Sequence, residues 1–307
     1  MLWVTTAWGL CFVAIRWGLE DAPVLWFAAL RALIAGAALL LVAAAQRRPL
    51  RPRGPSWGLL TAMAVVNVTV AFAAMFAGTA GLATGAAAVL SNAQPLLILL
   101  PAWWFYGEAV SVRSAASVVV GFAGLVLVGV ASGGGQGAWL SLLSAVAVTA
   151  GTLMSRRLSG TDLVVAIGWH FVIGGLLLVA LAAAVEGAPA IAWTPRFVLA
   201  LGFLSLIGTA AAFLAWFRQT QVARLDLLSA WTLLVPVIAM AVSAVLPGER
   251  PTVWSAVGAV IVLVSLALVT VPGRVRPGPW PVTPSTPAQV ATGPRGSPGS
   301  CPWTARD

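Results

Sequence analysis

Two ionisable side chains lie within otherwise apolar runs of this sequence, and they are the first candidates for chemistry. Arg31 lies about seven residues inside the run 24–45, and His170 lies at a similar depth inside 163–185. An ionisable residue at membrane depth is by default a candidate for binding, and arginine presents a rigid pair of N–H groups to a carboxylate. The alternatives are an arginine that snorkels or binds helix-end carbonyls and a histidine that only packs.

Neutral hydrogen-bonding side chains form a second candidate group, near the middle of two further apolar runs: Asn67, Ser91, Asn92 and Gln94. Pro95 follows directly and lacks a backbone N–H, which frees a carbonyl in the same helical turn. Thr209 and Trp231 occupy matching places later in the chain, and Trp8 and Trp231 are candidates for aromatic walls. Because small polar residues also hold membrane helices together, packing is the alternative to substrate binding.

The acidic residues all lie in loops, at expected helix ends or near the C-terminus: Glu20, Asp21, Glu108, Asp162, Glu186, Asp226, Glu249 and Asp307. A buried acid for a drug cation and a carboxylate proton relay are therefore missing. His170 is the only histidine, so a serine nucleophile in the membrane would have little choice of base. Cys11 and Cys301 form neither a disulfide framework nor a zinc site. We expect no cofactor, no metal and no enzymatic activity.

The composition places these residues in a membrane protein. Of the 307 residues, 60% are hydrophobic and 8% are charged, whereas soluble domains carry about 25% charged residues. A soluble enzyme is therefore excluded. Stretches of about 20 apolar residues can cross a bilayer as helices, and ten stretches approach this length: 2–19, 24–45, 57–78, 83–106, 112–131, 137–155, 163–185, 196–217, 225–247 and 252–272.

The positive charge indicates orientation. All 17 basic residues are arginines and the net charge is +9. With a cytoplasmic N-terminus, nine loop arginines lie inside and three lie outside, namely Arg16, Arg196 and Arg250. The positive-inside rule therefore predicts a multi-pass protein of the cell (inner) membrane with both termini in the cytoplasm. In a chain this apolar, the arginines are explained by the orientation of the helices in the membrane and by contact with the lipid bilayer. We therefore expect no nucleic-acid binding.

An internal repeat links the two halves of the chain. A shift of 141 residues superposes 57–128 on 198–269 without gaps. The shared markers are a proline and a later Gly-Glu pair: Pro95, Gly107 and Glu108 in the first copy, Pro236, Gly248 and Glu249 in the second. Each unit contains five expected helices, so the second copy inserts upside down. Inverted repeats are typical of transporters with a site at the midplane, although a duplication can also be purely architectural.

Several segments resemble EamA-type permeases of the drug/metabolite transporter superfamily. They are Ala7-Trp8-Gly9, the run 26–35 around Arg31, and the paired proline and Gly-Glu segments. The resemblance implies a ten-helix exporter of amino acids and other small metabolites with a central cavity. It makes Arg31 a family-like position and implies these cavity residues: Trp8, Asn67, Ser91, Gln94, Thr149, Thr209 and Trp231. The first run lacks the acid of the small multidrug relatives, which argues against export of cationic drugs.

The sequence thus predicts an all-α membrane protein with ten transmembrane helices in two inverted five-helix repeats, 1–131 and 132–272. The predicted function is alternating-access transport of a small-molecule substrate, such as an amino acid, by a monomer or homodimer. Two other classes stay open. An intramembrane lipid-modifying enzyme would need an acid–base set in the bilayer, and a non-transporting scaffold would act through the arginine cluster or the C-terminal segment.

The C-terminal segment 273–307 separates the scaffold from the transporter. Its eight prolines and five glycines predict a disordered cytoplasmic tail. Deleting 273–307 should leave metabolite export at the level of the full chain, measured in cells that express either form at equal amounts. Loss of all function on truncation would favour a scaffold that works through the tail.

Overall fold

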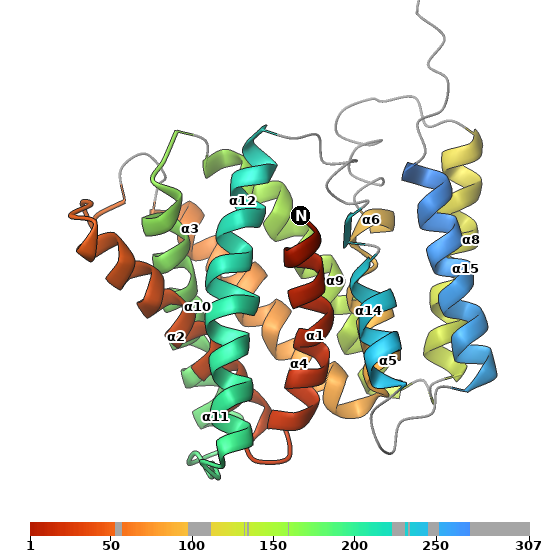
Figure 1. Ribbon diagram of the computed structural model, residues 1–307, viewed down its shortest axis with the longest axis horizontal. Helices are drawn as coiled ribbons and strands as arrows, with labels where there is room; N and C mark the ends of the chain where they lie inside the picture. Colours follow the sequence, from red (N-terminus) through yellow and green to blue (C-terminus); the bar gives the residue numbers. More distant parts are fainter. Residues whose placement is uncertain are drawn as a thin grey trace, which may run out of the picture. The chain divides into compact units, whose positions relative to one another are not determined.

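The computed structural model of the protein is helical throughout the part of the chain that it describes, and no strand occurs there (Figure 1). This part comprises residues 1–52, 57–97, 112–131, 133, 135–158, 160–222, 231–232, 234–244 and 252–270. The predicted tail 273–307 and both Gly-Glu pairs lie outside it. The helices are α1 (Leu2–Gly18), α2 (Val24–Ala45), α3 (Trp57–Met63), η1 (Ala64–Val70), α4 (Ala71–Gly81), α5 (Thr84–Ser91), α6 (Gln94–Leu97), α8 (Val112–Ala131), α9 (Gly135–Ser155), η2 (Arg156–Leu158), α10 (Leu163–Val185), α11 (Pro195–Gly202), η3 (Phe203–Ala211), α12 (Ala212–Val222), α14 (Leu234–Ser243) and α15 (Val253–Thr270).

Five helical stretches of the described part are long and apolar enough to cross a membrane: Val24–Ala45, Trp57–Gly81, Gly135–Leu158, Leu163–Val185 and Pro195–Val222. Shorter apolar helices cover Val119–Ala131, Leu234–Ser243 and Val253–Ser265. A helix pairs every interior backbone group within one segment, which explains why apolar runs in lipid fold this way. The prediction of an all-α membrane protein is confirmed, and the count of ten spans stays a prediction.

The helices pack in a regular set of pairs. Helix α2 lies along α10, and α8 lies along α15 (Figure 1). Helix α4 packs on α9, while α1 packs on the continuous helix formed by α11, η3 and α12. Helix α1 also contacts α14, and α9 contacts α5. Elements far apart in the sequence are therefore direct neighbours, and the first and second halves of the chain share one bundle.

Small residues allow the closest of these approaches. A Cβ atom at Gly36 of α2 would lie 2.8 Å from Val172 Cγ2 and 2.9 Å from the Gly168 carbonyl oxygen of α10. A Cβ atom at Gly168 would in turn lie 2.8 Å from Leu40 Cδ2. Glycine at both positions lets the two backbones approach, as in membrane helix pairs generally.

Two segments of π-helix, η1 and η3, lie inside otherwise α-helical spans. In each, a threonine hydroxyl donates to the carbonyl five residues earlier: Thr69 to Ala64 at 3.3 Å and Thr209 to Leu204 at 2.7 Å. These threonines are 140 residues apart, one fewer than the ungapped shift of 141. Both spans therefore contain a π-helical turn with a threonine at nearly the same place.

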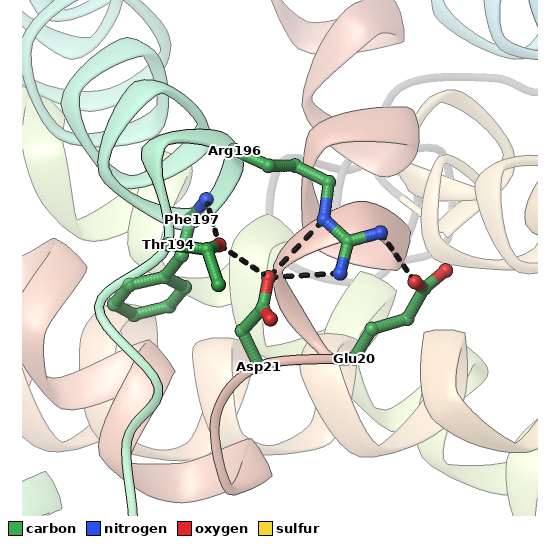
Figure 2. A network of polar contacts seen from close by, with 5 residues as sticks. All are labelled: Glu20, Asp21, Thr194, Arg196 and Phe197. Atoms are coloured by element: carbon green, nitrogen blue, oxygen red, sulfur yellow. Dashed lines mark hydrogen bonds and ion pairs between the residues drawn. The ribbon is translucent and has the colours of Figure 1, made fainter.

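Polar contacts tie the α1–α2 turn to the start of α11 (Figure 2). Arg196 donates from Nη2 and Nε to Asp21 Oδ2 at 2.9 and 3.1 Å and from Nη1 to Glu20 Oε2. The Thr194 hydroxyl donates to Asp21 Oδ2 at 2.9 Å and accepts from the Phe197 amide, which caps α11. The acidic turn and the basic helix start are thus bound at one end of the bundle.

Carboxylates also hold both ends of the α2–α10 pair. Glu186, which follows α10, accepts from the amides of Leu25 and Trp26 in the first turn of α2 at 2.9–3.1 Å. Asp162 caps α10 through the Val164 amide at 3.0 Å and pairs with Arg48, which follows α2, at 3.0 Å. These acids satisfy helix-end N–H groups and complement the positive helix ends, so the charges predicted for loops act as structural caps.

Replacing Glu186 tests the cap on α2. Glu186→Ala should destabilise the detergent-solubilised protein by about 1 kcal/mol, because two amides lose their acceptor. Glu186→Gln should cost less, since it keeps one acceptor oxygen. Glu20→Ala is the control: its side chain is 58% exposed, and exposed ion pairs contribute little. Equal thermal unfolding of Glu186→Ala and Glu20→Ala would contradict the capping role.

Candidate functional site

A cavity of about 670 Å³, counted out to its mouth, lies among helices of both halves of the chain. Its lining residues come from α1, α2, α4, α5, α6, α9 and α12, from Asn92 between α5 and α6, and from Thr232 ahead of α14: Trp8, Cys11, Phe12, Arg31, Phe72, Met75, Ser91, Asn92, Gln94, Ser144, Val148, Thr152, Phe213, Trp216 and Thr232. Five of the ten predicted site residues are in this set: Trp8, Arg31, Ser91, Asn92 and Gln94.

Arg31 is the charged member of the lining. The residue is 2% exposed. Its Nε donates to the Thr209 hydroxyl at 2.7 Å, and Nη2 lies 4.0 Å from Cys11 Sγ. Its guanidinium carbon lies 4.5 Å from the centre of the Phe72 ring and 5.7 Å from that of Phe76. The cation is therefore held by one hydroxyl and two aromatic rings, and cation–π attraction offsets part of its desolvation.

This environment leaves part of the guanidinium without a partner. Nη1 of Arg31 is buried and has no hydrogen-bond partner among the described residues. The ion pairs of the described part join Arg48 and Arg196 to loop acids and do not include Arg31. A buried charge with an open donor is costly unless an anion, or water, completes its shell. The site is therefore suited to a ligand with a carboxylate.

A helix break supplies the neutral polar groups. Helix α5 ends at Ser91 and α6 begins at Gln94, with Asn92 and Ala93 between them. Asn92 Nδ2 donates back to the Ala88 carbonyl at 2.8 Å, and Gln94 Nε2 donates to Thr152 Oγ1 of α9 at 3.1 Å. The amide oxygens of both side chains are acceptors that can serve a ligand.

Two buried hydroxyls on the cavity wall add further capacity. Ser91 Oγ and Ser144 Oγ are buried and have no hydrogen-bond partner within the described ranges. Buried hydroxyls in native proteins are ordinarily hydrogen-bonded. Ser91 Oγ, Ser144 Oγ and Arg31 Nη1 are therefore candidates for hydrogen bonds to a ligand.

The apolar part of the wall is aromatic. The Trp8 ring lies 5.6 Å from Phe213 and 5.1 Å from Trp216, centre to centre, and Phe213 lies 6.3 Å from Phe72. The Trp8 indole N–H donates to the Gly208 carbonyl at 3.1 Å. Its donor is thus used by the π-helical segment, and its ring faces the other aromatic side chains.

The lining carries the mark of the repeat. Four pairs of lining residues are each 141 positions apart: Cys11 and Thr152, Phe72 and Phe213, Met75 and Trp216, and Ser91 and Thr232. This spacing equals the shift that aligns the two halves of the sequence. Residues from both the N-terminal and the C-terminal part of the chain therefore line the same cavity.

Five predicted site residues do not line the cavity: Asn67, Thr149, His170, Thr209 and Trp231. Thr209 acts one step away, through its bond to Arg31. Thr149 donates to its own helix at Ala145, and His170 is fully buried against Phe171 and Phe217.

Asn67 and Trp231 are the other two. Asn67 is 1% exposed and lies against Gly151. A Cβ atom added to Gly151 would lie 2.4 Å from the Cβ atom of Asn67. Trp231 is 42% exposed, while its neighbour Thr232 lines the cavity. Successive residues of a helix point about 100° apart, so the prediction of Trp231 as a cavity wall missed by one position.

The structure also brings in residues that the sequence reasoning passed over: Cys11, Ser144, Thr152 and Trp216. Trp216 fills the place expected for Trp231 as the second tryptophan of the wall. A signal for Trp216 and Thr232 was present in the sequence, because the shift of 141 maps them onto Met75 and Ser91. Ser144 and Val148 carried no such signal.

These features describe a multi-pass membrane protein whose apolar helices surround a largely apolar cavity that contains a buried arginine. The chain belongs to the EamA-like transporter family, whose model matches residues 1–130 and 135–271. The protein is therefore a membrane transporter.

Individual relatives cover most of the chain. An uncharacterized transporter of Bacillus subtilis, YvbV, is 28% identical, over 88% of this chain and 93% of its own. A probable amino-acid metabolite efflux pump of Salmonella typhimurium is 27% identical, over 90% of this chain and 95% of its own. A solved crystal structure superposes with a TM-score of 0.66 at 20% identity, covering 87% of this chain and 94% of the other. That likeness shows the shared fold.

The bond between Thr209 and Arg31 is testable by removing one hydroxyl. Thr209→Val should destabilise the solubilised protein by about 1.5–3 kcal/mol, since a buried guanidinium N–H loses its acceptor. Thr209→Ser should retain most of the stability. Thr149→Val is the matched control, because its hydroxyl bonds only to Ala145 of its own helix. If both valine variants unfold at the same temperature, the Thr209 hydroxyl does not support Arg31.

Proposed function

We propose that this protein is a secondary transporter that exports small metabolites, such as amino acids, by alternating access through the central cavity. The observation that carries the proposal is the buried Arg31 guanidinium, with Nη1 unpaired among the described residues, in a cavity lined by corresponding positions of both halves. A transporter needs a site that both halves can expose in turn. An export direction is supported by the name of the relatives described as probable amino-acid metabolite efflux pumps.

The proposal includes ten spans in two inverted five-helix repeats, 1–131 and 132–272, with 273–307 as a separate tail. The two matches of the family model support this division. The packing supports it as well: α1 packs on the third span of the second half, and α9 packs on the third span of the first half. The π-helical segments η1 and η3 and the four lining pairs at a spacing of 141 agree with the same symmetry.

The residues divide the work of binding. Arg31 orients a substrate carboxylate through its open N–H groups. Asn92 and Gln94, at the α5–α6 break, bond polar groups of the substrate. Trp8 and Trp216 cover its apolar part. Thr209 does not line the cavity but positions Arg31 through its hydroxyl.

The proposed setting is the cell membrane, with both termini in the cytoplasm as the arginine distribution predicts. In that orientation the acidic α1–α2 turn and Arg196 lie on the outer side, and Arg48 with Asp162 lie on the inner side. Alternating access then requires the two halves to rock about the central cavity while these end contacts adjust.

Substitution of the cavity groups tests this function. Arg31→Ala and Gln94→Ala should each lower export by about tenfold or more, because each removes a polar contact to substrate in a buried site. The measurement compares metabolites inside and outside deletion cells that carry each variant at equal folded amounts. Arg157→Ala, an exposed arginine, is the control. Undiminished export by folded Arg31→Ala and Gln94→Ala would refute the site.

A further inference from the structure

We infer that the cavity selects monocarboxylates that carry an aromatic or bulky apolar body, and that an amine on the substrate is not needed for binding. This inference rests on the proposed function and specifies its substrate class. It follows from three features of the wall: its charge, the free edge of Arg31, and its rings.

The charge of the cavity is one-sided. Among the fifteen lining residues that the structure describes, Arg31 is charged and none is Asp, Glu, Lys or His. An ammonium group entering this space would lose its hydration, would be repelled by Arg31 and would meet only neutral acceptors. A carboxylate gains a charge-assisted contact in the same place. The cavity therefore distinguishes anionic from cationic ligands of the same shape.

The free edge of the guanidinium sets where the carboxylate binds. Nε is occupied by Thr209, and the face lies over the Phe72 ring. Nη1 has no partner within the described residues, and Nη2 has only the thiol of Cys11 at 4.0 Å. A carboxylate that approaches this edge can accept from both Nη atoms, the paired geometry for which arginine is suited.

The aromatic wall sets the body of the ligand. Trp8, Phe72, Phe213 and Trp216 form a connected series of ring contacts at 5.1–6.3 Å, and Arg31 stacks on one end of it. Because the Trp8 N–H is already bonded to Gly208, this indole offers only its ring to a ligand. Rings and large apolar groups bury well against such surfaces, and a short-chain carboxylate would leave most of the wall without contact.

The neutral groups lie on other elements. Ser91, Asn92 and Gln94 belong to the α5–α6 region, and Figure 1 shows α2, which carries Arg31, and α5 on opposite sides of α1. Such groups can bond a hydroxyl, an amide or an amine at the far end of a ligand. Uncharged acceptors contribute less to an ammonium than a carboxylate would, so an amine adds little next to the Arg31 contact.

Four related compounds separate the contributions of carboxylate, amine and ring. Binding to the full chain in lipid nanodiscs is measured by calorimetry for 3-phenylpropionate, phenylalanine, phenethylamine and propionate. We expect 3-phenylpropionate and phenylalanine to bind within about threefold of each other, and phenethylamine and propionate at least about tenfold more weakly. Arg31→Gln should weaken 3-phenylpropionate by about tenfold or more, whereas Arg157→Ala, at an exposed arginine, should leave it unchanged.

Phenethylamine binding as tightly as 3-phenylpropionate would overturn the inference, as would propionate doing so. Unchanged binding of 3-phenylpropionate to folded Arg31→Gln would overturn it too. The four-compound series on the unsubstituted chain decides the question even if Arg31→Gln does not fold. A different result would contradict the proposed function: the protein would export no metabolite when deletion cells with and without it are compared. Export of other metabolites without binding of the carboxylates would overturn only the substrate class.

Discussion

A guanidinium buried among apolar helices is the constraint on which the rest of this structure depends. Arg31 is 2% exposed, and its cost in the bundle has to be offset by contacts that several elements supply together. The hydroxyl of Thr209 comes from η3, and the ring of Phe72 comes from α4. The π-helical segment η3, α4 and α2 therefore have to meet at one place, and the cavity forms beside that meeting point.

The second organising feature is the correspondence between the halves. Four pairs of lining residues are 141 positions apart, the spacing of the proposed repeat. They do not make the two halves chemically equal, because Arg31 has no charged counterpart: the nearby position in α10 is His170, which is fully buried against phenylalanine rings. The proposed repeat thus provides matched halves, while the charge on one of them gives the cavity its polarity.

The charged residues at the bundle ends do separate work. Glu186 and Asp162 cap helices, and Arg196 ties the α1–α2 turn to α11. With the described acids used in this way, Arg31 has no acidic partner within the described residues. The division of charge between ends and centre is what makes an anionic ligand the natural complement of the cavity.

The sequence by itself determined the class of fold and the side chains to consider. The reason is that the length of each apolar segment indicates whether it can cross a bilayer, and the arginines in the loops indicate its orientation. Arg31, Gln94 and Trp8, which the sequence singled out, line the cavity in the structure, and their role in binding stays a prediction. Tertiary structure decided which face each residue presents. Trp231 and Thr232 are adjacent, yet only Thr232 lines the cavity, since a helix turns each residue by about 100°. The partners of Arg31 lie 178 positions away at Thr209 and 41 away at Phe72, and only packing brings such distant residues together.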